Sequence, residues 1–415
     1  MDASIDETAT PLRADPLWRR YLLARSVSWA GSTMTLVALP LMVFQHTGSP
    51  ALTAALAAVE SVPYLVFGLL AGALADRWDR RRTLVATSLA QALLLGGIPA
   101  AAVLDVLTPA HVFVAAAGSG IAAVFFDAAS FAVLPALVGG RRIARATASS
   151  VSAYTVIGLA GPAVAGLIAT AAGPATAIGL DALSFAAAAA LLARLPLARL
   201  SALAAPPPGP RRRLGAEIRE GLAFVRHHPA VRSYTLLGIG NSLTGGAVLG
   251  LIVVVAVDRL GLAAHDWRVG LCYVAACAGT LVANTALPRL RARMPAGWIT
   301  LAGLAANWLA LLAWAGATRL GPALAALLLW QATNSLVSVN GIVARQQAAP
   351  DHLQGRVNAT ARMIAWGGQP LGAALGGMIA EAAGVRIALL AAGCAVLAAA
   401  VAGWATPLRH RTSPS

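Results

Sequence analysis

Apolar residues run along the chain in twelve stretches of about 20 residues, separated by short polar segments that carry most of the charges. A helix of this length crosses the roughly 30 Å hydrocarbon core of a bilayer. The pattern therefore predicts an all-α membrane protein with twelve transmembrane helices. The predicted spans are 21–45, 51–75, 83–106, 109–135, 150–171, 174–195, 234–257, 268–288, 298–317, 321–345, 358–381 and 385–406.

The segment 196–233 is the longest polar interruption, and it divides the spans six and six. Its Ala-Pro-Pro-Pro-Gly-Pro run at 205–210 cannot continue a helix, whereas apolar residues recur at helical spacing from Leu214 to Val225. We expect a flexible linker and then an amphipathic helix on the cytoplasmic surface; the simpler alternative is a solvated connector. The predicted order is an arm (1–20), a six-helix bundle (21–195), the linker (196–233), a second six-helix bundle (234–406) and a tail (407–415).

The arginines are distributed unequally between the two sets of loops. The N-terminal arm with the first turn of the first span, alternate loops and the tail hold 27 of the 31 arginines, and the other loops hold only Arg259, Arg268, Arg319 and Arg386. Because positive residues accumulate on the cytoplasmic side of membrane proteins, we expect both termini and the central linker there. The acidic arm before the first span does not resemble a signal peptide, so we expect that span to be retained. A bacterial inner membrane is the expected location.

Composition supports a membrane protein and excludes some chemistry. The chain is 58% hydrophobic and carries a formal charge of +15, all of it from arginine because there is no lysine. A phosphate-binding P-loop and a pyridoxal Schiff base both need lysine, so neither is available. The seven histidines and three cysteines show no metal-ligand spacing. We expect no cofactor, metal or nucleic-acid partner.

The two halves of the chain resemble each other. Shifting the sequence by 211 positions aligns 145–173 with 356–384 without a gap, and it matches Gly161 with Gly372 and Gly173 with Gly384. A duplicated six-span unit is typical of transporters that rock two bundles about a central site. The internal repeat therefore points to transport.

A dense charged segment at 72–82 lies between the second and third spans, on the predicted cytoplasmic side. It resembles the loop signature of the major facilitator superfamily, through Gly72, Leu74, Asp76, Arg77, Arg80 and Arg81. The family pattern usually has glycine where this chain has Asp79, a substitution found in the branch of enterobactin exporters and macrolide efflux proteins. This resemblance implies the twelve-helix fold of that superfamily and a gating role for the segment.

A second motif, Gly158, Gly161, Pro162 and Gly166 in the fifth span, is similar to the antiporter signature of exporting members. It departs from that signature in having Ala165-Gly166 where paired glycines are usual. The arginine common early in the fourth span of drug-proton antiporters is also missing, since 112–118 carries no charge. The resemblance thus implies export while leaving the proton pathway of those pumps open here.

Ionisable residues inside a bilayer are costly, so each one is a functional candidate. Glu60, in the middle of the second span, is our candidate for the proton-titrating group; the alternative is a carboxylate that bonds a neighbouring helix. Asp181 is a second candidate, for which packing or hydration is the alternative. The resemblance implies that Asp127 pairs with Arg80 or Arg81 as a conformational latch.

In related transporters the first, fourth, seventh and tenth spans line the cavity. Mostly apolar walls with a few amides and indoles suit amphipathic compounds. The cavity candidates, which could also bond helix to helix, are Arg25, Trp29, Asn241, Trp330, Gln331 and Asn334.

These observations predict a secondary transporter that exports a small amphipathic drug, siderophore or secondary metabolite in exchange for protons. We expect it to act as a monomer in the lipid bilayer. The alternatives are a nutrient importer with the same fold, and a membrane sensor or enzyme. An enzyme would need a paired catalytic base, which the sequence does not offer.

Overall fold

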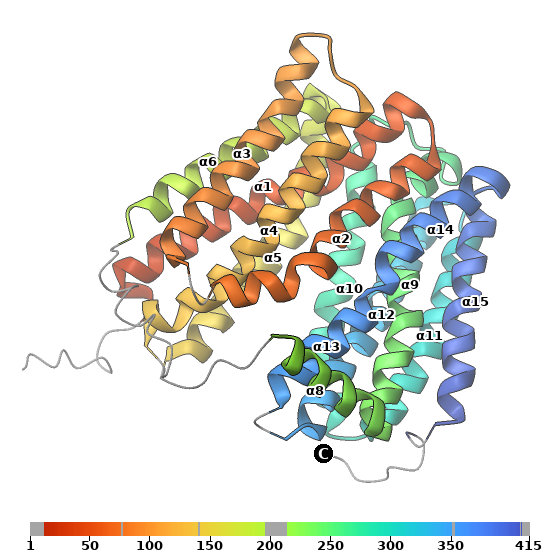
Figure 1. Cartoon of the computed structure of the whole chain (residues 1–415). Helices are drawn as coiled ribbons and strands as arrows, with labels where there is room; N and C mark the ends of the chain where they lie inside the picture. Colours follow the sequence, from red (N-terminus) through yellow and green to blue (C-terminus); the bar gives the residue numbers. More distant parts are fainter. Residues whose placement is uncertain are drawn as a thin grey trace, which may run out of the picture. The chain divides into compact units, whose positions relative to one another are not determined.

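The computed structural model describes residues 12–75, 78–139, 142–195, 214–350, 353–406 and 408. These residues form helices, with no strand among them, which confirms the all-α prediction (Figure 1). The elements are η1 (Leu12–Ala14), α1 (Pro16–Thr47), α2 (Pro50–Ala75), α3 (Arg80–Val103), α4 (Pro109–Val138), α5 (Ile143–Ala172), α6 (Pro174–Ala193), α8 (Leu214–His227), α9 (Pro229–Asp258), α10 (Arg268–Arg291), α11 (Ala296–Gly316), α12 (Leu320–Ala348), α13 (Gln354–Trp366), α14 (Gly368–Ala383) and α15 (Val385–Trp404).

Eleven helices among the described residues are long and apolar enough to cross a membrane, and each overlaps one predicted span, although several predicted spans run one to three residues past the end of their helix. The one remaining predicted span, 358–381, is the eleventh along the chain. It is divided into α13 and α14 at Gly367. Pro370 explains the break, because proline has no N–H to bond the carbonyl of Trp366 one turn earlier. That carbonyl instead accepts a 3.5 Å hydrogen bond from the Ser242 hydroxyl of α9.

The chain forms two compact units, whose boundaries differ from the predicted bundles. The first unit holds residues 1–38 and 66–208, and the second holds 39–65 and 209–415. The end of α1 and the start of α2 therefore pack with the second half of the sequence rather than with the first. The predicted division into two six-helix bundles remains a prediction.

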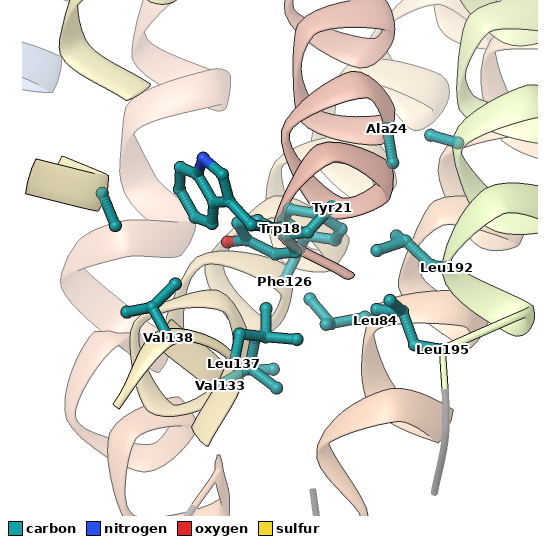
Figure 2. Close-up of a cluster of buried hydrophobic side chains, with 13 residues drawn as sticks. Trp18, Tyr21, Ala24, Leu84, Phe126, Val133, Leu137, Val138, Leu192 and Leu195 are labelled. Atoms are coloured by element: carbon teal, nitrogen blue, oxygen red, sulfur yellow. The ribbon is translucent and has the colours of Figure 1, made fainter. Parts of the chain in front are cut away.

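The first unit is organised around large side chains from four helices. Trp18 and Tyr21 of α1 pack with Leu84 of α3, Phe126 of α4 and Leu192 of α6, all 5% exposed or less (Figure 2). Figure 2 shows these residues converging on one another beside Val133, Leu137, Val138 and Leu195. This cluster fixes the first half of α1, which carries Arg25 and Trp29.

The second unit is held together by glycines between α9 and α14. A Cβ added at Gly372 would lie 1.9 Å from the Leu243 carbonyl oxygen, and one added at Gly246 would lie 1.8 Å from that of Gln369. Apolar side chains gain little by leaving lipid for a helix interface, so close backbone packing through small residues is what stabilises such contacts. The α9–α14 pair is therefore the central contact of this unit.

The helix bounds confirm the internal repeat. Shifted by 211 positions, α5 coincides with the range from the start of α13 to the end of α14, and α6 coincides with α15. Gly173 and Gly384 join these helices with φ of 84° and 88°, a left-handed conformation that strains other residues. The repeat thus preserves both the helix lengths and the turn between them.

The predicted amphipathic helix exists as α8, and the linker residues 196–213 before it lie outside the described residues. Its Val225 is buried with Val231, Leu353 and Val357, so the helix packs against the start of α13 as well as facing solvent (Figure 1). This contact ties α8 to the second unit.

Gly372→Ala tests the glycine packing. Because the new methyl group would collide with the backbone of α9, we expect a loss of about 1–3 kcal/mol in folding stability, seen as a lower melting temperature in detergent. The control is Gly97→Ala, where a Cβ meets nothing within 4 Å and the helix gains propensity. Equal melting temperatures for the two variants would contradict this account.

Candidate functional site: one cavity in each unit

The first unit contains a cavity of about 420 Å³ between α1, α4 and α5. Most of its walls are apolar or aromatic, and it brings together the predicted residues Arg25, Trp29 and Asp127. Tyr154 of α5, which the sequence did not single out, stands edge-on to Trp29 with ring centroids 5.4 Å apart. The cavity therefore offers flat aromatic surface next to one pair of opposite charges.

The charge of Arg25 is compensated within this cavity. Its guanidinium lies 3.7 Å from the Asp127 carboxylate and stacks on two rings, 4.6 Å from Trp29 and 4.7 Å from Phe126. An unpaired arginine inside a membrane span would be costly, and an ion pair with cation–π contacts lowers that cost. Asp127 thus stabilises Arg25, whatever else it does.

The charged segment before α3 is partly described. Asp76 and Arg77 lie outside the described residues, and Gly72 lies near the end of α2. Asp79 caps α3 by accepting a 2.7 Å hydrogen bond from the Arg82 amide, which explains a carboxylate where the family usually has glycine. The predicted pairing of Asp127 with Arg80 or Arg81 remains a prediction.

Other side chains tie this segment to the first unit. Arg81 donates a 3.0 Å hydrogen bond to the Leu195 carbonyl, at the end of α6. Trp78, which the sequence did not single out, stacks on Phe125 of α4. The segment therefore contacts the residues just after α6 and the middle of α4, besides the two helices that it connects.

Asp181 lies outside the cavity, in a buried contact between α1 and α6. Its carboxylate accepts hydrogen bonds from the hydroxyls of Thr35 and Ser184, and its side chain is 1% exposed. Gly31 makes this contact possible, since a Cβ there would lie 2.4 Å from the carboxylate. Its partners are thus hydroxyl groups rather than cations.

Glu60 lies on the part of α2 that belongs to the second unit. None of the ion pairs between described residues includes it. It lies within electrostatic range of Tyr273 of α10, whose hydroxyl is buried without a hydrogen-bond partner. The pair of an intramembrane carboxyl and an unsatisfied phenol was not visible in the sequence, because 213 positions separate the two residues.

The second unit contains a smaller, more polar cavity of about 210 Å³, lined mainly by α9, α12, α13 and α14, with Thr300 of α11. Two predicted cavity residues, Gln331 and Asn334, line it. So does Arg345 at the end of α12, which the sequence places at the edge of an apolar run, where arginines commonly reach for water. Its burial, at 4% exposure, could not be read from that position.

Two other predicted cavity residues serve the helix contacts instead. Asn241 donates hydrogen bonds to the Asn334 carbonyl (3.0 Å) and the Ser338 hydroxyl (2.9 Å), joining α9 to α12. Trp330 is fully buried. We therefore assign no substrate contact to either residue.

The antiporter-like motif lies on α5. Gly158, Pro162 and Gly166 are buried. A Cβ at Gly161 would lie 2.2 Å from the Thr33 hydroxyl of α1. Its repeat partner Gly372 makes the same kind of close approach to α9, so both halves use this position to bring their first and fifth spans together. The two cavities are likewise built on the first, fourth and fifth spans of each half.

Among protein families, the model described as transmembrane secretion effector matches residues 7–414. The multidrug efflux pump Tap of Mycolicibacterium fortuitum is 29% identical over 390 residues, covering 89% of this chain and 90% of that protein. The enterobactin exporter EntS of Shigella boydii is 26% identical over 369 residues, covering 88% and 85%.

Solved structures show the same fold. The nucleoside transporter NupG matches with a TM-score of 0.75 at 13% identity, covering 94% of this chain and 98% of that one. A bacterial homologue of the iron transporter ferroportin in an inward-facing state matches with a TM-score of 0.72 at 16% identity, covering 95% and 99%. At these identities the likeness concerns the fold alone.

A double-mutant cycle on Arg25 and Asp127 tests the ion pair. Asp127→Asn leaves the guanidinium without its counter-charge, so we expect it to lower the melting temperature, and Arg25→Gln in the same protein to recover part of the loss. A coupling energy of about 0.5–3 kcal/mol is expected. Strictly additive effects would show that the contact contributes nothing to stability.

Proposed function

Because the chain belongs to the transmembrane secretion effector family of major facilitator transporters, we propose that it exports small amphipathic molecules across the bacterial inner membrane in exchange for protons. Membership of this family makes it a multi-pass membrane transporter. Direction, coupling and cargo are our proposal, as are a monomeric state and cytoplasmic termini.

The aromatic cavity of the first unit is the observation that carries the choice of cargo. Trp29, Tyr154 and Phe131 give it flat apolar surface, and the compensated Arg25–Asp127 pair gives it polarity without net charge. Such a cavity favours ring-containing molecules with a few polar groups over sugars, which need many hydrogen-bond partners. The names of the relatives, an efflux pump and a siderophore exporter, support the outward direction.

We assign proton coupling to Glu60. A carboxyl group in the middle of a membrane span is costly when charged, and protonation removes that cost. The helix segment that carries Glu60 could then change its surroundings in step with the proton. The hydroxyl of Tyr273, which is buried in the same unit without a hydrogen-bond partner, supports this proposal as an acceptor or donor for one protonation state.

Glu60→Gln tests this assignment in a strain that lacks other pumps. We expect efflux of ethidium to fall by at least about tenfold and to lose its response to a protonophore, because the amide cannot titrate. Asp105→Asn, an exposed acid with positive φ that asparagine also tolerates, is the control and should leave both unchanged. If Glu60→Gln retained protonophore-sensitive efflux, Glu60 would not be the coupling group.

We further propose that the turn between α1 and α2 forms part of the external gate. Glu381 of α14 accepts hydrogen bonds from the Ser49 hydroxyl (2.8 Å) and the Ala51 amide (3.1 Å), which caps the start of α2. Nearby, Ala54 packs closely against Gly250 and Gly377. A Cβ added to either glycine would come within about 3 Å of Ala54. These contacts are all within the second unit, and alternating access requires a seal on this side to open.

Glu381→Gln tests the gate. A weaker cap should raise the labelling rate of a cysteine introduced at the buried Thr53, in a protein without native cysteines, by a membrane-impermeant maleimide added outside. A change of about 2- to 10-fold corresponds to the loss of a helix cap. Asp258→Asn, an exposed acid at the end of α9, is the control. Unchanged labelling in Glu381→Gln would remove Glu381 from the gate.

A further inference from the structure

Arg345 in the cavity of the second unit carries a charge that nothing in the described structure compensates. Its side chain is 4% exposed, its Nε is buried without a hydrogen-bond partner, and none of the ion pairs between described residues includes it. Buried charges in proteins are normally paired or hydrogen-bonded, because desolvation of a lone ion is costly. Arg345 departs from that rule inside a cavity.

The residues around Arg345 favour a ligand there. The guanidinium of Arg345 lies against Gly341, one turn earlier on α12, at van der Waals distance. Gln331, Asn334, Ser338 and Gln369 add neutral donors and acceptors to the same cavity. The Oε1 atom of Gln331 is also buried without a partner.

The equivalent cavity of the first unit provides the contrast. There Arg25 faces Asp127 at 3.7 Å and lies over two aromatic rings, so its charge is already compensated. Both cavities are built on the same spans of the repeat and both contain an arginine, but only the first has a carboxylate in its lining. In the second cavity, a ligand can supply the carboxylate that the lining does not provide.

We propose that this cavity is a subsite for an anionic group, a carboxylate by preference, on the transported molecule. The planar guanidinium matches the two oxygens of a carboxylate, and the surrounding amides bind its polar neighbours. Trp366 provides an exposed ring at the cavity wall against which an aromatic part of the molecule stacks. The subsite rests on the proposed transport function and narrows its cargo to molecules that carry an acid on an apolar or aromatic body.

A binding experiment on purified protein tests this subsite. The probes are 1-naphthoate and its neutral isostere 1-naphthamide, and the readout is the dissociation constant from ligand-dependent thermal stability in detergent. We expect wild type to bind naphthoate more tightly than naphthamide. Arg345→Gln should weaken naphthoate by roughly 10- to 100-fold, the range for a charge-assisted bond, and leave naphthamide within about twofold.

Two further variants separate recognition from structural roles. Arg345→Lys keeps the charge and loses the planar fork, so we expect an intermediate naphthoate affinity. Arg259→Gln removes an arginine that bonds the Ala315 carbonyl elsewhere in the same unit, and it should change neither ligand. If Arg345→Gln lowered stability but kept the preference for naphthoate, Arg345 would serve only the end of α12, and the proposal would be wrong.

The source of the anion is tested in parallel. If phosphatidylglycerol abolished naphthoate binding to wild type, a lipid headgroup would occupy the site and the proposal would be overturned. Efflux of fluorescein and of ethidium from cells then separates the two proposals. If Arg345→Gln loses efflux of fluorescein but keeps efflux of ethidium, the result supports the subsite. If wild type exports neither dye but still binds naphthoate, the result contradicts export and leaves the subsite supported.

Discussion

The cost of placing an uncompensated charge in hydrocarbon governs this chain. With 31 arginines and 16 acids in a sequence that is 58% hydrophobic, almost every charge is kept in loops and helix ends. The few inside the spans are each handled differently. Arg25 is paired and stacked, Asp181 accepts two hydroxyl hydrogen bonds, Glu60 has no ion-pair partner among the described residues, and Arg345 has no counter-charge among them either. In the first two arrangements the protein itself provides the partner of the charged group. In the last two, a proton can neutralise Glu60 and an anionic ligand can pair with Arg345.

The same bilayer explains why glycine carries so much of the packing. Where apolar surface gains little from association, helices must approach closely enough for backbones to touch. Gly161 against Thr33 and Gly372 against Leu243 show this at repeat-related positions. A framework stabilised by backbone contacts places few demands on the polar residues beside it, so those residues are free to differ between the halves.

Much of the fold follows from sequence because its signals are local. Span length and the offset of 211 positions are both read along the chain, and the helix bounds agree with them. The break at Gly367 also had a local signal in Pro370, which a hydropathy pattern does not register. The membership of 39–65 in the second unit had none, because it depends on contacts such as that of Glu381 with Ser49, more than 300 residues away. The candidate site divides in the same way: residue types could be chosen by position, but the partner of Arg25 and the burial of Arg345 depend on which helices pack together.

The contrast between the cavities bears on how one duplicated unit can serve two tasks. If each cavity contained an arginine paired with an acid, each would be neutral and neither would distinguish an anionic ligand from its neutral isostere. Arg25 lies on the first span of its half and Arg345 on the fourth span of its half, so the two charges arose at different positions of the same glycine-packed framework, and the charge of Arg345 is one that a bound anion can satisfy. The first half then supplies apolar, aromatic surface of broad selectivity, and the second supplies a demand for one functional group. Selectivity for a class of cargo follows from that difference, without any change in the helices that move.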